Sequence, residues 1–368
     1  MAETTKKITY ITGQLGLGGA EKQLFLLAKE LHKRGWDVSV ITLSPETNNY
    51  YQIPLEQNGV EVYGIPLGSS QRSRFIKITK FLKTKKPDIV HSWNLFTNFY
   101  AAFCGHYAAV PVIVGSERAN EHFTIIDMGR IKYNLNLIGL KFLVTNNQGA
   151  AELLAKSHPH IPTYIIPNGI ERPYLPMSQN ECRKLLDIPD NSLVIGGAGR
   201  LEQRKNFKQF INIASLLAEK NENLYFAVLG DGPERFELES IAEKKLPPNT
   251  WKFFGYLPDA RRYFPAFDIF CYTSLPYEGM PNVIMEACAA GLPVVASAVN
   301  GVHEIILNED SGFLIEDSNS ELFVEKINQL IEDNELRETI GKAGKERMEK
   351  LFSVEKMTNN MISIYDRW

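Results

Sequence analysis

The chain has 368 residues, of which 44% are hydrophobic and 23% charged, and its net charge at neutral pH is -3. These proportions are typical of globular proteins, and the length favours two domains. No apolar run approaches the roughly 20 residues of a membrane-spanning helix, and we expect no signal peptide. Four scattered cysteines predict inert thiols in a reducing cytoplasm. The composition therefore excludes a disordered chain, a disulfide-rich secreted scaffold and an integral membrane protein.

Charge is distributed unequally along the chain. Residues 1–180 carry 19 Lys and Arg against 13 Asp and Glu, whereas residues 181–368 carry 21 against 30. A basic half followed by an acidic half indicates two domains with different partners.

Short apolar runs alternate with helical patterns through the first half. Residues 7–12 predict a strand, a Gly-rich turn follows, and residues 20–33 predict a helix. Further strands are predicted at 38–43, 60–65, 88–91, 112–115 and 142–145. This alternation is typical of a parallel sheet covered by helices on both faces.

The same pattern restarts in the second half after a Pro- and Gly-rich linker at residues 166–176. Strands are predicted at 193–197, 224–229, 251–253, 269–272 and 294–296. From about Asn319 the chain is predicted to be helical to its end. The predicted fold class is α/β, with two doubly wound parallel-sheet domains whose ligands bind beyond the carboxyl ends of the strands.

The first loop that could bind a ligand is Gly13–Glu21, between the first strand and the first helix. Its glycines let the backbone approach a phosphate at a helix N-terminus. A nicotinamide-binding loop would need G-x-G-x-x-G and an acid closing the second strand, and both are absent. The loop predicts phosphate approach, with a plain tight turn as the alternative.

Two further loops follow strands of the second half. In Gly199–Asn206, Arg200 and Lys205 are placed to converge on a diphosphate, and a solvated charge run is the alternative. In Leu229–Glu234, Gly230 allows a base or sugar to lie on the backbone, although the motif alone indicates only a turn and a helix start.

Residues 274–296 form the most informative segment. Glu278 lies in a loop after a predicted strand, and residues 279–283 present N–H groups at the start of a helix. Glu286 follows Asn282 by four residues and therefore shares its helix face. Because carboxylates accept hydrogen bonds from sugar hydroxyls, the segment predicts a hydroxyl-rich ligand beside an anion site.

This Glu-x7-Glu segment, together with the three loops and Ile166–Ile170, resembles the retaining, nucleotide-sugar-dependent glycosyltransferases of family four over nearly the whole chain. The resemblance implies a GT-B fold, with two Rossmann-like domains facing across a cleft. It implies an acceptor domain at 1–170, a donor domain at 171–352, and a last helix within 353–368 that packs back on the first domain.

The activity implied is the metal-independent transfer of a hexose from a nucleotide sugar, with UDP favoured, to a glycan or lipid-linked acceptor in polysaccharide or glycoconjugate biosynthesis. No cofactor and no metal are expected. The alternatives are a transferase for a small soluble acceptor, or a sugar-nucleotide epimerase or binding protein of the same fold.

The resemblance also assigns donor residues. Arg200 and Lys205 would bind the diphosphate, Glu286 the ribose and Glu278 the transferred sugar. The remaining donor candidates contribute mainly backbone groups: Gly18, Gly19, Gly230, Tyr256, Leu257, Gly279, Met280, Pro281, Asn282 and Val283.

The chain departs from the family at two histidine positions on the acceptor side. His-x-His is replaced by His91-Ser92-Trp93, and Arg118 stands where a later histidine is usual. Arg118 is permanently charged, so it can stabilise charge but cannot act as a base. The acceptor candidates are Asn94, Ser116, Glu117, Arg118 and His122, and the catalytic candidates are Glu278, Arg118, Arg200 and Lys205. No nucleophile is assigned.

Residues 72–86 carry seven basic and no acidic side chains and predict an amphipathic helix. Such a helix is a candidate for peripheral contact with an anionic membrane, with an ordinary sheet-covering helix as the alternative. Nucleic acid is excluded as a partner because no stacking array accompanies the basic residues. We expect a cytoplasmic protein that can act at the membrane face.

Overall fold

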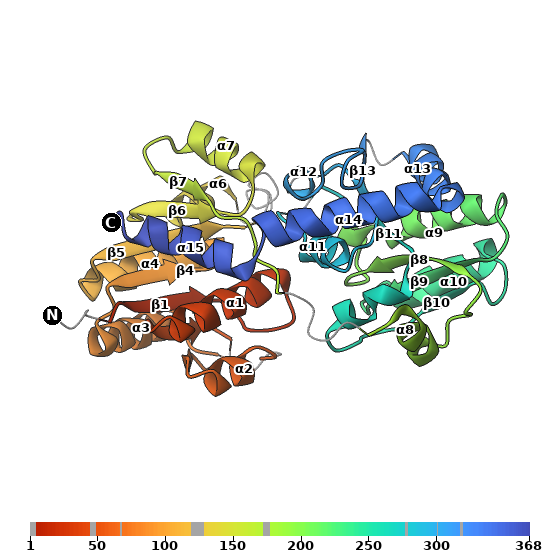
Figure 1. The fold of residues 1–368 in the computed structure, drawn as a ribbon. Helices are drawn as coiled ribbons and strands as arrows, with labels where there is room; N and C mark the ends of the chain where they lie inside the picture. Colours follow the sequence, from red (N-terminus) through yellow and green to blue (C-terminus); the bar gives the residue numbers. More distant parts are fainter. Residues whose placement is uncertain are drawn as a thin grey trace. The chain divides into compact units, whose positions relative to one another are not determined.

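The computed structural model describes residues 5–44, 49–66, 68–118, 129–171, 177–276, 279–299, 301–316 and 319–368. The chain divides into two compact units (Figure 1). Unit 1 comprises Met1–Gly169 with Val354–Trp368, and unit 2 comprises Ile170–Ser353.

Unit 1 contains a seven-stranded sheet with the order β3-β2-β1-β4-β5-β6-β7, and its strands pair in parallel. The strands are β1 (Lys7–Thr12), β2 (Asp37–Thr42), β3 (Glu61–Gly64), β4 (Ile89–Ser92), β5 (Val112–Glu117), β6 (Phe142–Thr145) and β7 (Thr163–Ile165). The chain changes direction across the sheet between β1 and β4, which is where doubly wound folds form a binding crevice.

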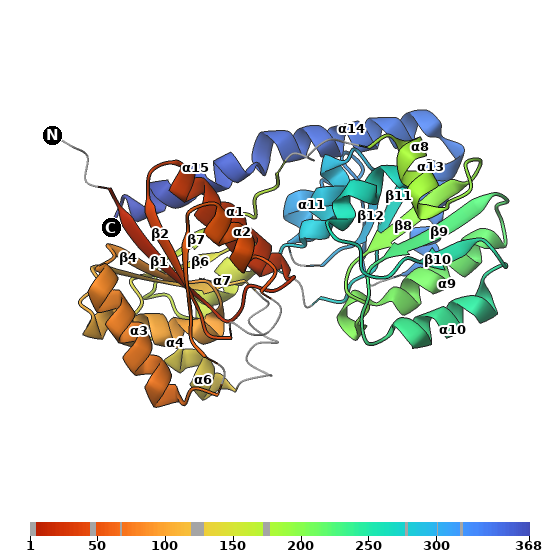
Figure 2. The ribbon, with the colours of Figure 1, turned by 90° about the horizontal axis from the view of Figure 1, so that it is seen from below.

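Helices cover both faces of this sheet. They are α1 (Gly19–Lys33), α2 (Gln52–Gln57), α3 (Gln71–Lys85), α4 (Leu95–Tyr107), α6 (Arg130–Leu135), α7 (Gln148–Ser157) and α15 (Val354–Tyr365). One core packs α1, α2 and α15 against the sheet, and a second packs α3 and α4 on the other side (Figure 2). The strands read as continuous apolar runs because they are buried on both faces.

Unit 2 contains a six-stranded parallel sheet with the order β10-β9-β8-β11-β12-β13. The strands are β8 (Leu193–Ala198), β9 (Leu224–Leu229), β10 (Trp251–Phe253), β11 (Ile269–Tyr272), β12 (Val294–Ser297) and β13 (Phe313–Ile315).

The α-helices of unit 2 are α8 (Gln179–Leu186), α9 (Phe207–Ala218), α10 (Arg235–Lys245), α11 (Asn282–Ala289), α12 (Val302–Ile305), α13 (Ser320–Glu332) and α14 (Asn334–Leu351). Two 3-10 segments, η1 (Gln203–Lys205) and η2 (Ala260–Ala266), lie in loops. One core packs α8, α11 and α12 against the sheet, and the other packs α9, α10 and α13.

Two doubly wound parallel α/β sheets confirm the predicted fold class. Local sequence rules explain several helix starts. Asn94 and Thr97 form a capping box at α4, and Ser178 and Glu181 form another at α8. Within the described residues, no helix combines the length and the apolar character needed to cross a bilayer.

Candidate active site

Three glycines with positive φ lie at the carboxyl edge of the sheet in unit 2: Gly199, Gly230 and Gly255. Gly230 follows β9 with φ +145°, and its N–H donates to the Gly255 carbonyl at 2.9 Å. A Cβ added at Gly230 would lie only 1.9 Å from the Gly199 carbonyl oxygen. Only glycine fits there, and a planar or sugar group can lie directly on this backbone.

Arg200 and Lys205 follow the neighbouring strand β8. The Arg200 side chain is 71% exposed and its Nε lies 3.5 Å from a carboxylate oxygen of Glu202. The Lys205 stem runs past Gly199, and its Nζ lies 5.7 Å from the centre of the Tyr272 ring. Both cations therefore come from the loop beside the glycine edge.

Hydrogen bonds fix this loop to the segment after β11. The Arg204 carbonyl accepts from the Leu275 N–H at 2.8 Å and from the Ser274 hydroxyl at 3.0 Å. The Thr273 hydroxyl donates to the Asn206 carbonyl at 3.0 Å. The segment that leads to Glu278 is thus attached to the loop with the two cations. Glu278 itself lies outside the described residues.

Helix α11 starts just beyond this segment, with Pro281 as its N-cap and Asn282 as its first residue. Gly279 and Met280 are buried, and the backbone at Gly301 passes close to them. A Cβ at Gly301, which has φ +76°, would lie 1.7 Å from the Gly279 carbonyl oxygen. The N–H groups of this helix start are therefore held in a compact turn.

Glu286 is half-buried on α11, four residues after Asn282. The guanidinium of Arg261, on η2, lies close to its charge. Burial opposes the charge of Arg261, but Asp259, Glu286 and Glu171 together outweigh burial and raise the pKa of Arg261. The Arg261 Nε lies 2.6 Å from Asp259 Oδ1. Glu286 thus lies in a cluster of charged side chains. The other members of this cluster, Arg261, Asp259 and Glu171, were not among the site residues predicted from the sequence.

A buried polar chain lies below the carboxyl edge of unit 1. His91 Nε2 is hydrogen-bonded to the Ser116 hydroxyl at 2.9 Å, and His91 Nδ1 to the Tyr365 hydroxyl at 2.6 Å. Tyr365 continues to the Tyr10 hydroxyl at 3.1 Å. Burial, followed by the charge of Arg118, holds the pKa of His91 well below its usual range, so the imidazole is neutral.

Arg118 stacks on the ring of Trp93, with its guanidinium carbon 3.6 Å from the ring centre. Its Nη1 donates to the Asn168 side-chain oxygen at 3.3 Å. Burial lowers the pKa of Arg118 to about 9, which still leaves the group charged at neutral pH. The two residues at the histidine positions therefore form one cation–π pair.

The other acceptor candidates have roles inside unit 1. Asn94 accepts a hydrogen bond from the Thr12 hydroxyl at 2.8 Å and caps α4. Ser116 has no exposed surface and Glu117 has almost none. These residues support the edge of the sheet in the structure, and His122 lies outside the described residues.

Gly18 and Gly19 form the start of α1, but the Glu21 side chain folds back over them. A Cβ at Gly18 would lie 1.9 Å from a carboxylate oxygen of Glu21. Burial raises the pKa of this carboxyl, against hydrogen bonds from its own N–H and from Gln14. An anion approaching Gly18 has to displace this carboxylate first.

Across the described ranges, no group of three or more His, Cys, Asp and Glu side chains is arranged to hold a metal ion. The four cysteines are buried and free.

Two family patterns match the chain, one in each half. "Glycosyl transferases group 1" matches residues 178–347, and "Glycosyltransferase Family 4" matches residues 17–172. The chain belongs to the family 4 glycosyltransferases. The family consists of retaining enzymes, so the resemblance noted in the sequence is confirmed.

Relatives of this glycosyltransferase have low sequence identity but align over most of the chain. The lipopolysaccharide core biosynthesis glycosyltransferase LpsD of Rhizobium meliloti is 25% identical over 95% of both chains. An Escherichia coli UDP-Gal:alpha-D-GlcNAc-diphosphoundecaprenol alpha-1,3-galactosyltransferase is 27% identical over 79% of this chain and 78% of its own.

Solved structures show the GT-B fold of this glycosyltransferase. Anabaena HepE in complex with UDP-glucose aligns with a TM-score of 0.85 and 23% identity, over 98% of this chain and 100% of its own. WaaG, a glycosyltransferase involved in lipopolysaccharide biosynthesis, aligns with a TM-score of 0.76 and 19% identity over 96% and 99%.

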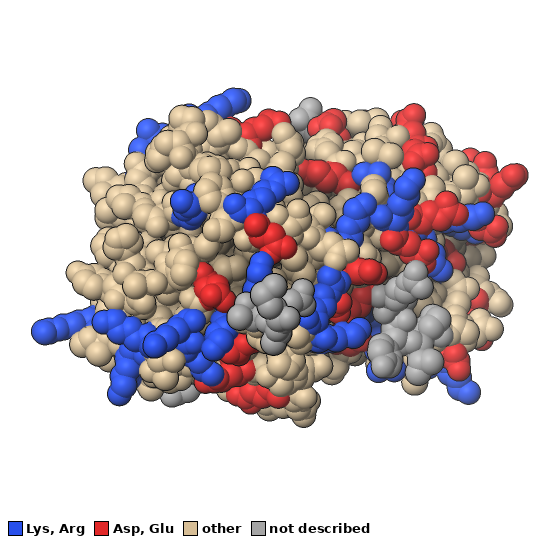
Figure 3. Space-filling view, turned by 60° about the vertical axis from the view of Figure 1, so that its left-hand side comes forward, with Lys and Arg blue, Asp and Glu red and all other residues tan. Residues whose placement is uncertain are grey.

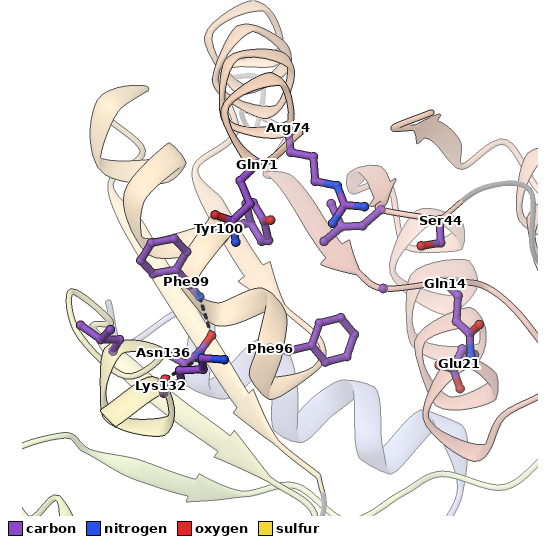
Figure 4. A pocket seen from close by; sticks show the side chains of 13 residues that line it. Gln14, Glu21, Ser44, Gln71, Arg74, Phe96, Phe99, Tyr100, Lys132 and Asn136 are labelled. Atoms are coloured by element: carbon purple, nitrogen blue, oxygen red, sulfur yellow. Dashed lines mark hydrogen bonds between the residues drawn. The ribbon is translucent and has the colours of Figure 1, made fainter. Parts of the chain in front are cut away.

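The structure also shows a pocket that sequence reasoning missed. It lies in unit 1 of this glycosyltransferase, beyond β1 and β2, and has a volume of about 570 Å³ (Figure 4). Its walls come from four helices and two loops that are separate in sequence. Two stretches of the sequence had drawn attention to this region: the basic segment 72–86, which contains Arg74, and residues 125–140, which carry Arg130 and Lys132 among apolar side chains.

Proposed function

We propose that this glycosyltransferase moves a hexose from a UDP-sugar to a glycan or lipid-linked acceptor during cell-surface polysaccharide assembly, with retention and without a metal. LpsD supports the polysaccharide assignment, and the Escherichia coli galactosyltransferase supports both a UDP donor and a lipid-linked acceptor. The GT-B fold holds UDP-glucose in HepE.

One observation carries the donor assignment: along the carboxyl edge of the sheet in unit 2, the glycines after β10 and β9 are followed by the cations after β8 and then by α11, which carries Glu286. Arg200 and Lys205 would bind the diphosphate, and Glu286 would accept from the ribose. The backbone of Tyr256 and Leu257, which follows Gly255, would meet the base.

The departing UDP would gain its stabilisation from fixed charges. The two cations and the N-terminus of α11 offer positive potential where negative charge develops on the diphosphate. Glu278, with the backbone at residues 279–283, would hold the sugar. On the acceptor side, Arg118 would stabilise charge without taking a proton.

The first prediction concerns Glu278. The Glu278→Ala variant should lose sugar transfer while keeping most of its UDP affinity, because the carboxylate would contact the sugar and not the nucleotide. Transfer from radiolabelled UDP-glucose and UDP-galactose to total lipid extract, and UDP titration by calorimetry, measure the two quantities. Glu349→Ala removes an exposed carboxylate of the same unit and serves as the matched control.

Several outcomes would contradict the proposal. Equal loss of transfer and UDP binding in Glu278→Ala would refute the sugar-binding role. Complete loss of wild-type transfer in EDTA, restored by Mg²⁺, would refute the metal-independent mechanism. Conversion of one UDP-sugar into its epimer without an acceptor would favour an epimerase of the same fold.

We also propose that unit 1 contacts the cytoplasmic face of a membrane through α3. Figure 3 shows Lys and Arg gathered at the lower left of the view, where α3 lies, beside surface with few charged side chains. The inward positions of α3, Ile78 and Leu82, are fully buried, so the helix also covers the sheet. The sheet-covering alternative thus describes the inward face of α3, and the proposed membrane contact would use its outward face.

A further inference from the structure

The pocket in unit 1 is built from the carboxyl ends of β1 and β2 and from α1, α3, α4 and α6. It therefore adjoins the point where the strand order reverses, the usual place for a ligand in a doubly wound sheet. The ring of Phe96 lies against Gly13, whose added Cβ would fall 2.3 Å from the ring. The pocket floor is thus backbone covered by an aromatic side chain.

Two cations line this pocket. Arg74 reaches down from α3 beside Tyr100 (Figure 4). Its Nε is buried and has no hydrogen-bond partner, and within the described ranges Arg74 forms no ion pair. Lys132 lines the wall that α6 provides. A buried guanidinium nitrogen without a partner is costly, which indicates that a ligand completes the site.

The acidic residue in the wall, Glu21, does not neutralise these cations. Its carboxylate is turned onto Gly18 at the N-terminus of α1, where the positive end of the helix dipole compensates its negative charge. In Figure 4 it lies with Gln14 on one side of the pocket, and Lys132 with Asn136 lies on the other. The remainder of the pocket is left with net positive charge.

The pocket wall continues into exposed apolar surface. Phe96 and Leu135 line the pocket, yet they are 51% and 43% exposed. Other exposed apolar side chains of α4 and the α6 region extend this surface: Phe103, Tyr107, Ile131 and Ile138. Aromatic packing of Phe75, Phe99 and Phe103 holds α3 against α4. A cationic pocket thus opens beside an apolar strip.

We propose that this pocket binds the phosphate or diphosphate of a lipid-linked acceptor, with Arg74 and Lys132 as its ligands and the lipid chain along the strip of Phe96, Phe103, Leu135 and Ile138. The inference rests on the proposed function and gives its acceptor a chemical class. It also assigns acceptor binding to residues other than the five acceptor candidates from the sequence, which were Asn94, Ser116, Glu117, Arg118 and His122. A lipid diphosphate fits because it joins concentrated negative charge to an apolar chain, as the pocket joins cations to the strip.

The test compares farnesyl diphosphate with inorganic pyrophosphate, titrated by calorimetry into the full chain with UDP at saturation, so that a donor site is already filled. Arg74→Ala should weaken farnesyl diphosphate at least about tenfold, and Arg74→Lys should recover part of the affinity. Arg72→Ala, which removes an exposed guanidinium of the same helix, should leave affinity unchanged. A double variant, Phe96→Ser with Leu135→Ser, should weaken farnesyl diphosphate and not pyrophosphate.

The outcomes separate the pocket from the proposed function. Equal loss in Arg74→Ala and Arg72→Ala, or no wild-type binding of farnesyl diphosphate, would overturn the site. Equal affinity for the two probes would overturn the lipid class and leave a site for free phosphate. Farnesyl diphosphate binding through Arg74 in a chain that binds no UDP would refute the proposed function and keep the pocket. If Arg74→Ala still transferred sugar to lipid extract at the wild-type rate, the pocket would be refuted as the acceptor site and the proposed function would stand.

Discussion

At the scale of single residues, glycines shape the carboxyl edge of the sheet in unit 2, where we propose that the donor binds. Gly230 combines a φ of +145° with a Gly199 carbonyl 1.9 Å from its missing Cβ, so two separate penalties fall on one substitution. A residue other than glycine in this sparsely populated backbone region costs roughly 1–3 kcal/mol. The contact adds to this cost because a backbone carbonyl cannot move aside as a flexible side chain would. Sequence motifs mark such glycines, but the contact that requires them appears only in the structure.

Gly230→Ala should therefore lower the free energy of unfolding by about 3 kcal/mol or more and abolish UDP affinity. Denaturant unfolding and calorimetric UDP titration measure the two effects. Gly291→Ala is the matched control, because Gly291 also has positive φ, +82°, while its Cβ would meet only the flexible Lys345 side chain at 3.9 Å. A similar small loss in both variants would mean that the Gly199 contact relaxes freely.

At the scale of elements, every strand inside the two sheets was predicted, whereas two of the four edge strands were missed. Residues 224–229, 251–253 and 269–272 were predicted with the boundaries that β9, β10 and β11 have. The missed strands, β7 and β13, each have three residues and lie at the edge of a sheet. An edge strand pairs on one side only, so fewer of its positions must be apolar and its pattern is weak.

Sequence reasoning proposes candidate site residues that lie in contiguous motifs and misses those that distant elements bring together. The proposed donor loops are contiguous motifs, so the sequence indicated Arg200 and Lys205 through the glycines beside them. Arg261 belongs to no motif, and Arg74 lies in the basic segment 72–86, whose sequence gives no sign of a pocket. Each acquires its surroundings from elements distant in sequence, the first from Glu286 and the second from four helices around a pocket.

The final helix, α15, contributes Tyr365 to the buried row of hydrogen bonds that contains His91. Burial in this row keeps His91 neutral in the folded state, whereas an unfolded histidine titrates near pH 6.5. Below that pH the unfolded state binds a proton that the folded state does not. Stability should therefore fall on acidification, by up to about 2 kcal/mol between pH 7 and pH 5.

Urea unfolding at both pH values measures this loss. His91→Gln should be less stable at pH 7 and should lose part of the pH slope, because its side chain does not titrate. His106→Gln, at an exposed position of α4, should keep the wild-type slope. Identical slopes in all three proteins would show that groups other than His91 set the acid sensitivity.

For the whole molecule, the charge asymmetry has different consequences in the two halves. The acidic half gathers Arg200 and Lys205 at one edge, where we propose that the diphosphate binds although the net charge of this half would repel it. In the basic half, α3 buries one face and turns lysines such as Lys80 and Lys83 outward, as a helix that adheres to an anionic surface does. The proposals for the two halves therefore rest on the local placement of charge and not on its sum.

Exposed lysines near an anionic leaflet each contribute about 1 kcal/mol to binding, and salt screens them over about 10 Å at 0.1 M. A triple variant of unit 1 should therefore lower the partition onto vesicles of phosphatidylglycerol and phosphatidylcholine about 100-fold: Lys80→Gln, Lys83→Gln and Lys86→Gln. Vesicle co-sedimentation across a salt series measures this effect.

The matched control removes three exposed lysines of unit 2: Lys184→Gln, Lys220→Gln and Lys244→Gln. If the control lost as much binding, net charge would drive the association and α3 would have no special role. Wild-type binding that persists in high salt would instead point to the apolar side chains of α4 and α6.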